Sequence, residues 1–225
     1  MAKTKLIGDD ENGGKAWREG DLITTFALKR IKEYMTPLMK EWLDAPLPTL
    51  DAYEQLHFDK TIKKAIKGIE GWSEEELKMK FITHILDLGY LNDEEPYIGY
   101  FDKIISATVD SIKLTVKADF MLAKGVLDAF TTPYFHFQEF KPYKNPKGDS
   151  MAQLLQAMMI GQVKNQNDKP MYGIEIIGDQ WIFVIMEGKS YCISKKFNST
   201  EHQELLQIIA ILRKFRTILR ERLID

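Results

Sequence analysis

The sequence predicts an α/β fold, in which a mixed β-sheet is flanked by helices. Apolar residues recur at spacings of three and four in the first 90 residues and again near the end of the chain, which is typical of amphipathic helices. Between these regions lie short segments rich in β-branched and aromatic residues, separated by turn residues, which is typical of strands. The order of elements therefore favours helices first, then a mixed sheet with further helices.

The N-terminal part divides into two segments. Residues 1–20 are rich in Gly, Asp, Glu and Asn and are expected to form a flexible tail. Residues 21–70 are expected to form a helical extension, in which Thr36-Pro37 begins a new helix because proline suits the first helical position. A further helix is expected over about 50–68. Its inward face is predicted to carry Tyr53, Leu56, Ile62 and Ile66.

Residues 71–225 are expected to form the α/β core, packed with the extension as one compact domain. Ser73 and Glu76 have the spacing of a capping box, which opens a helix that Gly89 ends. Strands are predicted over 99–108, 112–122 and 134–141, a helix over about 150–164, a three-stranded meander, and a last helix from about Thr200 to Leu223. The second strand is predicted to place on one face Leu114, Val116, Ala118, Phe120 and Leu122.

Composition excludes several classes of protein. No apolar run approaches the roughly 20 residues that span a bilayer, and the N-terminus has no apolar stretch typical of a secretory signal. The single cysteine, Cys192, provides neither a disulfide framework nor a cysteine-rich zinc site. A cytoplasmic protein without a membrane partner is expected. The 31 Lys and Arg against 33 Asp and Glu give a net charge of −2, which argues against a dedicated nucleic-acid binder unless basic residues form patches.

Few motifs compete for the site of chemistry. The sequence has no Gly-x-Ser-x-Gly, no glycine-rich phosphate loop and no dinucleotide-binding fingerprint. The histidines fall on separate predicted elements without the spacing of metal ligands and are interpreted as structural. These are His57, His84, His136 and His202.

One set of polar residues on the predicted strands suits metal-dependent chemistry. Glu139 and Lys141 are two positions apart, so both side chains project from one face while Phe140 points to the other. Asp119 lies on the preceding strand. If these strands pair, Asp119 and Glu139 can flank one Mg²⁺ or Mn²⁺ ion, and the Phe140 carbonyl can complete its shell. Taken alone, Glu139 and Lys141 are explained more simply as a surface ion pair worth about 0–1 kcal/mol.

The surrounding sequence resembles a nuclease family. Four segments resemble, in their order, those of the N-terminal nuclease domain of type I restriction enzyme R subunits, in the PD-(D/E)XK superfamily. They are residues 73–90, Lys117-Ala118-Asp119-Phe120-Met121-Leu122, Glu139-Phe140-Lys141 and Gln153-Leu154. The resemblance covers about residues 73–160, and its motifs are short. Ala118 precedes Asp119 where the motif has proline, a departure that the superfamily often tolerates.

The resemblance implies a restriction-endonuclease-like core and Mg²⁺-dependent hydrolysis of nucleic-acid phosphodiester bonds, with DNA as the expected partner, in restriction, defence or repair. It implies that Asp119, Glu139 and Glu74 bind the metal, that Lys141 is the catalytic lysine, and that Gln153 lies near the substrate backbone.

Three alternatives stay open. Glu75 competes with Glu74 for the role of the helix carboxylate. The fold is also compatible with a nuclease-like module that binds nucleic acid or protein without catalysis, or with an unrelated α+β domain. A second copy of the chain is a further candidate partner.

Overall fold

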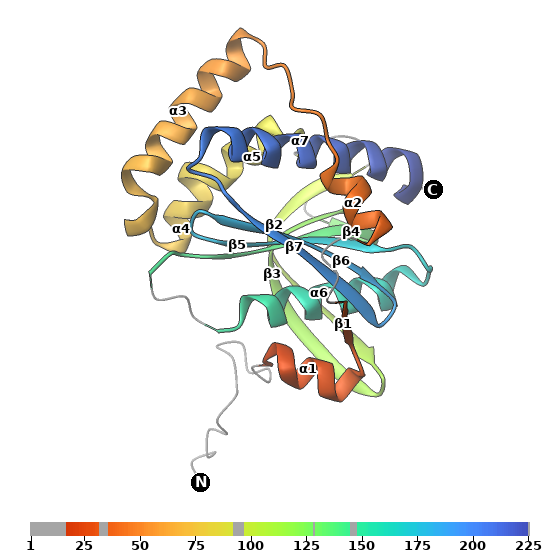
Figure 1. The fold of residues 1–225 in the computed structure, drawn as a ribbon. Coiled ribbons are helices and arrows are strands. Elements are labelled where there is room, and N and C mark those ends of the chain that lie inside the picture. Colours follow the sequence, from red (N-terminus) through yellow and green to blue (C-terminus); the bar gives the residue numbers. More distant parts are fainter. Residues whose placement is uncertain (1–16, 32–35, 92–96, 128, 145–147, 225) are drawn as a thin grey trace.

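The computed structural model describes residues 17–31, 36–91, 97–127, 129–144 and 148–224 (Figure 1). Its centre is a seven-stranded sheet in the order β1-β7-β6-β5-β4-β3-β2. The strands are β1 (Lys29–Ile31), β2 (Ile98–Val109), β3 (Ile112–Val126), β4 (Ala129–Lys141), β5 (Met171–Ile177), β6 (Gln180–Glu187) and β7 (Ser190–Asn198). The pairs β1–β7 and β4–β5 are parallel and the others antiparallel, so the predicted mixed sheet is confirmed.

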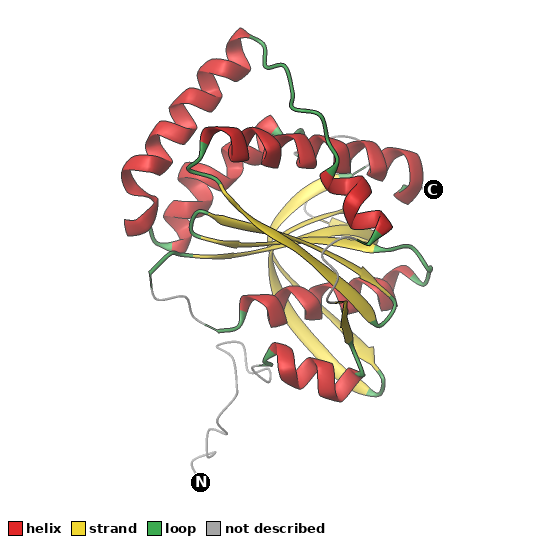
Figure 2. Cartoon of the chain, in the orientation of Figure 1, coloured by secondary structure: helices red, strands yellow, loops and turns green. Residues whose placement is uncertain are grey.

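Helices cover both faces of this sheet (Figure 2). They are α1 (Glu19–Phe26), α2 (Pro37–Leu43), α3 (Ala52–Gly68), η1 (Ile69–Gly71), α4 (Glu74–Leu77), η2 (Lys78–Ile82), α5 (Thr83–Leu88), α6 (Ser150–Asn165), α7 (His202–Ile218) and η3 (Leu219–Leu223). Helices α1 and α6 lie on one face, and α2, α3, α5 and α7 on the other (Figure 1). None of the described helices is both long and apolar enough to cross a lipid bilayer.

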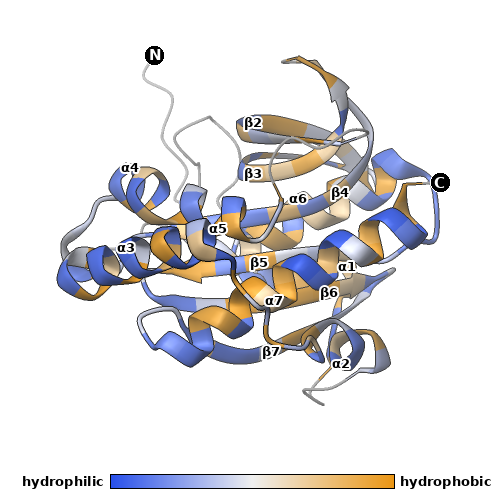
Figure 3. Ribbon diagram, turned by 90° about the horizontal axis from the view of Figure 1, so that it is seen from above, coloured by the Kyte–Doolittle hydropathy of each residue, from blue (hydrophilic) through white to orange (hydrophobic). Residues whose placement is uncertain are grey.

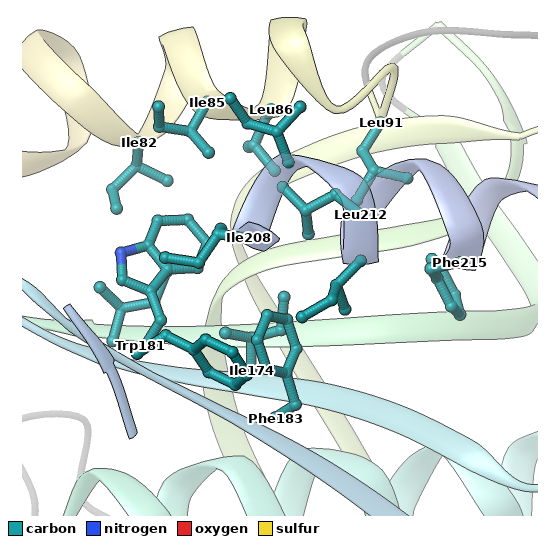
Figure 4. Close-up of a cluster of buried hydrophobic side chains, with 14 of the residues drawn as sticks. Ile82, Ile85, Leu86, Leu91, Ile174, Trp181, Phe183, Ile208, Leu212 and Phe215 are labelled. Carbon is teal, nitrogen blue, oxygen red and sulfur yellow. The ribbon is translucent and has the colours of Figure 1, made fainter. Parts of the chain in front are cut away.

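Two apolar clusters hold the layers together. On the α7 face, Trp181 and Phe183 of β6 pack beneath Ile208 and Leu212 of α7 and residues of α5 (Figure 4). On the α6 face, the cluster joins α1 and α6 to the long strands β2, β3 and β4. Helices α3 and α7 carry distinct hydrophobic and hydrophilic residues along their length, as expected of helices that bury one face (Figure 3).

The N-terminal segment differs from its prediction in two places. Trp17 is buried against Phe26, with ring centroids 5.5 Å apart, so the predicted tail is wrong for residues 17–20. Residues 1–16 lie outside the described part of the chain. The helical prediction is wrong at Lys29–Ile31, which forms β1. Ala27 adopts a left-handed conformation (φ 54°) that ends α1, and the strand then pairs with β7.

The helix expected over 50–68 is present as α3, but its buried face is different. Tyr53, Leu56 and Ile66 are exposed, and only Ile62 of the predicted inward set is buried. The buried face consists of Glu54, Phe58, Thr61, Ile62 and Ala65. The start of the preceding helix is as predicted, because the Thr36 side chain accepts a hydrogen bond from the amide of Met39.

The helix expected over 73–89 comprises α4, η2 and α5. Its capping box is confirmed: Ser73 and Glu76 each accept a hydrogen bond from the other's backbone amide. The middle section, η2, is a π-helical turn, a widening that is frequent at functional sites. Gly89 follows α5 as predicted, but for steric reasons, because a Cβ there would lie 2.7 Å from the Cβ of Leu212 on α7.

The long strands contain irregularities that the sequence pattern did not reveal. Leu114, Val116 and Ala118 belong to the cluster on the α6 face, whereas Phe120 and Leu122 belong to that on the α7 face, so the predicted single face is wrong. The switch from the α6-face cluster to the α7-face cluster occurs beside Asp119. Opposite it, Asp102 of β2 has a left-handed conformation (φ 56°), and the pairing skips these two residues.

Candidate functional site

Asp119 lies on β3 at the point where backbone pairing with β4 gives way to a side-chain contact. The last backbone pair on this side joins Phe120 to Gln138. Beyond it, Asp119 Oδ2 accepts a 2.7 Å hydrogen bond from the amide of Phe140. The side chain is buried, with an exposed fraction of 5%. Asp119 is thus held beside the Glu139–Lys141 segment, as the sequence predicted.

Glu139 and Lys141 form a direct ion pair at the end of β4. Lys141 Nζ lies 2.7 Å from Glu139 Oε1, and both side chains are buried, with exposed fractions of 8% and 2%. An ion pair so removed from water differs from the exposed pair that is the simpler sequence interpretation, since desolvating two charges is costly. The interpretation of Glu139 and Lys141 as a surface ion pair is therefore wrong, because the pair is buried.

The electrostatics of the two carboxyls favour their neutral forms. Burial raises the pKa of Asp119 to about 6, although Lys141 and the Phe140 amide oppose the increase. Burial also raises the pKa of Glu139 well above its usual value, and the charge of Asp119 adds to this. Burial lowers the pKa of Lys141, but Glu139, Asp119 and Glu74 outweigh it and leave that pKa raised. Two acidic side chains, Asp119 and Glu139, thus share one buried lysine, Lys141, in a poorly solvated site.

Glu74, at the start of α4, is the helix carboxylate that reaches this cluster. Its Oε2 lies 3.6 Å from Lys141 Nζ. Glu75 instead pairs with Lys78 at 3.1 Å, and its side chain is 72% exposed. The geometry thus places Glu74 and not Glu75 beside Lys141.

The two remaining predicted groups are the Phe140 backbone carbonyl and the Gln153 side chain. The Phe140 amide faces Asp119, and in a regular strand the N–H and C=O of one residue point toward the same neighbouring strand. The Phe140 carbonyl is therefore directed to the Asp119 side. Gln153 lies in the first turn of α6, and its buried Oε1 has no hydrogen-bond partner.

A second set of charges beside the site was missed by the sequence analysis. Asp102 lies 2.8 Å from both Lys78 and Lys117, and the pKa of Lys117 is raised chiefly by its hydrogen bond to Asp102. Asp119 also acts electrostatically on Lys117, which places this lysine near the site. The only sequence signal was the polar Lys117 two positions before Asp119, because the left-handed backbone of Asp102 cannot be read from its neighbours.

Two further arrangements were not anticipated. Glu175 is the register partner of Glu139 on β5, and its buried carboxylate accepts a 2.5 Å hydrogen bond from Ser150 Oγ. His57 and His84, although on separate helices, approach within 3.0 Å. Sequence spacing could not reveal either contact, since each depends on tertiary packing.

The donor set suits a divalent cation with a preference for oxygen ligands. Asp119 and Glu139 offer buried carboxylates, and burial raises the pKa of both. Mg²⁺ is bound in proteins by one or two carboxylates and retains several waters. Among the described residues, the carboxylates of Glu74, Asp119 and Glu139 do not all converge within 4.8 Å. Lys141 Nζ stands between Glu139 and Glu74.

Comparison with protein-family models and with curated proteins finds no match to this chain.

Proposed function

We propose that the chain hydrolyses phosphodiester bonds of nucleic acid, DNA in the first instance, at the site formed by Asp119, Glu139 and Lys141. The observation that carries the proposal is the burial of two carboxylates and one lysine around the Phe140 amide. Maintaining three ionisable groups out of water costs free energy, and such costs are concentrated at functional sites. A nuclease site of the PD-(D/E)XK kind accounts for all three groups.

The chain's residues would divide the work. Asp119 and Glu139 would hold Mg²⁺ or Mn²⁺ directly, with the Phe140 carbonyl as a neutral ligand and Glu74 acting through coordinated water. When bound, the metal supplies Lewis-acid stabilisation of the phosphate and a more acidic water. Lys141, which pairs with Glu139 in this structure, would donate to the phosphate oxygens as negative charge develops. Gln153, whose Oε1 is unpartnered, would orient the substrate backbone through its amide.

A binding module without catalysis is the second candidate. It is favoured by the ion pair itself, because Lys141 is already engaged by Glu139 at 2.7 Å and lies 3.6 Å from Glu74. The net charge of −2 is common to both candidates and weakens the case for either on nucleic acid. Only turnover distinguishes them.

The test is cleavage of labelled duplex and single-stranded DNA and RNA in Mg²⁺, Mn²⁺ or chelator. We expect cleavage that requires the metal and is lost in Asp119→Ala and Glu139→Ala. Asp168→Ala, at an exposed loop position, is the matched control and should cut like the wild type. If the wild type cuts none of these substrates under any condition, the catalytic proposal fails and the binding module replaces it.

A further inference from the structure

A second cluster of ligand-type side chains lies on the opposite end of the helix that begins at Glu74. His57 comes from α3, while His84 and Asp87 come from one turn of α5. His57 Nε2 lies 3.0 Å from His84 Nδ1. One ligand atom from each residue, including a carboxylate oxygen of Asp87, falls within 4.8 Å of the other two. The three groups thus converge from two helices onto one small region.

The spacing of these atoms is close to that of a metal site. Zn–N distances of about 2.0–2.1 Å in a tetrahedral arrangement separate two ligand nitrogens by about 3.3–3.4 Å. The two imidazole nitrogens are a few tenths of an ångström closer, which a small rotation of either half-buried ring would correct. A hydrogen bond between neutral imidazoles accounts for the 3.0 Å contact, whereas a metal ion accounts for the convergence of all three ligand atoms.

We propose that His57, His84 and Asp87 bind one divalent transition-metal ion, with Zn²⁺ as the physiological candidate. Imidazole nitrogen selects Zn²⁺, Ni²⁺ or Cu²⁺, whereas Mg²⁺ prefers oxygen ligands such as those around Asp119. Three protein ligands leave a fourth position for water. The site is therefore chemically distinct from the Asp119–Glu139 cluster and does not depend on it.

The placement of the site indicates what the metal does. Helix α3 belongs to the N-terminal segment, whereas α5 continues the helical segment that begins with Glu74. A metal ion held by both helices would join them at that point. Because α4, η2 and α5 are continuous, the same ion would restrict movement of the helix that carries Glu74. We therefore infer that the metal ties α3 to α5, with water in its fourth position.

The experiment uses the full chain after removal of metal by chelator and dialysis. Zn²⁺ is titrated calorimetrically, and Co²⁺ is titrated separately, because its visible absorption reports the coordination geometry. We expect one Zn²⁺ per chain, little competition from excess Mg²⁺, and a Zn²⁺-dependent rise in the melting temperature. An absence of stoichiometric Zn²⁺ binding by the wild type overturns the proposal.

Variants then locate the ion. His57→Asn and His84→Asn should each lower the Zn²⁺ affinity by on the order of 10²-fold or more, given that even outer-shell changes cost 10–100-fold. Both should also abolish the Zn²⁺-dependent rise in melting temperature. Asp59→Asn, at an exposed position of α3, is the matched control. The double variant Asp119→Ala/Glu139→Ala should retain the Zn²⁺ site. Unchanged affinity in both histidine variants would place the ion elsewhere and refute the proposal.

Discussion

The amide of Phe140 donates a 2.7 Å hydrogen bond to Asp119 Oδ2, and this bond replaces the backbone pairing that β3 and β4 would otherwise make. It ties a buried carboxylate of one strand to the residue between Glu139 and Lys141 on the next. The contact fixes Asp119 in a place where its charge is poorly solvated. The ionised Asp119 carboxylate, which metal binding needs, is therefore expected to lower the stability of the fold.

The first prediction concerns this effect on stability. Burial raises the pKa of Asp119 from 3.8 to about 6, so the folded state holds this proton more tightly than the unfolded state. A shift of about two units corresponds to about 3 kcal/mol of destabilisation. The penalty is absent below about pH 4 and complete above about pH 6. Asp119→Asn, which keeps an acceptor for Phe140, should therefore be more stable than the wild type by up to about 3 kcal/mol at pH 8.

Urea denaturation at pH 8 and at pH 4 measures this difference. The gain in the free energy of unfolding should shrink toward zero at the lower pH, because the penalty for ionising Asp119 is nearly absent there. Asp168→Asn, at an exposed position, should match the wild type at both values. A gain that is equal at pH 4 and pH 8 would show that it does not come from the Asp119 charge.

The second prediction separates the lysine from the metal ligands. Lys141→Ala should lower the rate of cleavage by on the order of 10²–10³, the usual cost of losing one positioned electrostatic donor. It should leave binding of Mg²⁺ intact or stronger, because Lys141 Nζ no longer pairs with Glu139. Calorimetric titration of Mg²⁺ and the cleavage assay provide the two measurements.

Lys189→Ala serves as the control, because the Lys189 side chain forms an exposed ion pair with Asp110. It should change neither quantity. If Lys141→Ala cuts as fast as the wild type, the chemistry lies elsewhere. If it loses Mg²⁺ binding as Glu139→Ala is expected to do, Lys141 supports the metal site and does not act on the phosphate.

The sequence predicted the elements well where local pattern determines them. The capping box at Ser73, the meander after Met171 and the pairing of the strands that carry Asp119 and Glu139 all followed from local signals. The prediction failed where tertiary packing overrides periodicity. Helix α3 has apolar residues around much of its surface, so the pattern could not show that Tyr53 faces solvent and Glu54 the interior.

The arrangement of the site could likewise be predicted only where neighbouring strands determine it. Glu139 and Lys141 share one face of their strand and Asp119 lies on the strand before it, and the family resemblance singled out these three residues among other polar ones. The partners of Lys117 could not be predicted, since Asp102 reaches it from a left-handed backbone position in β2. The contact of His57 with His84 depends on the packing of two helices that are distant in sequence.

The third prediction concerns the lysine beside the site. Lys117 is partly exposed and is held by Asp102 at 2.8 Å. If nucleic acid enters at Asp119, Lys117 should contact its phosphates. Lys117→Ala should then weaken duplex binding and reduce the slope of log K against log salt by about 1. Fluorescence anisotropy of labelled duplex in chelator, over a series of salt concentrations, measures both. Lys113→Ala, an exposed lysine on the same strand, should have a smaller effect, and equal effects would argue against a localised contact.

The last prediction concerns the junction of the N-terminal segment with the core. Glu54 of α3 accepts hydrogen bonds from Tyr90 Oη and from Arg213 Nη2 of α7, the latter at 2.7 Å, and Arg213 Nε also donates to the Leu88 carbonyl. Burial raises the pKa of Glu54, but Tyr90, the Asp51 amide and Arg213 outweigh it and leave that pKa lowered. The carboxylate is thus well compensated. Its loss would leave Arg213 partly buried without its charge partner.

Glu54→Ala should therefore lower the free energy of unfolding by about 2–3 kcal/mol, somewhat less than the 3–5 kcal/mol typical of a fully buried pair, because both side chains keep some contact with water. Gln55→Ala, at the neighbouring exposed position, should cost well under 1 kcal/mol. A double-mutant cycle with Arg213→Ala tests the pairing itself. Residues in one network are not additive, so the double variant should be less destabilised than the sum of the single variants. Strict additivity would mean that Glu54 supports α3 by a route other than Arg213.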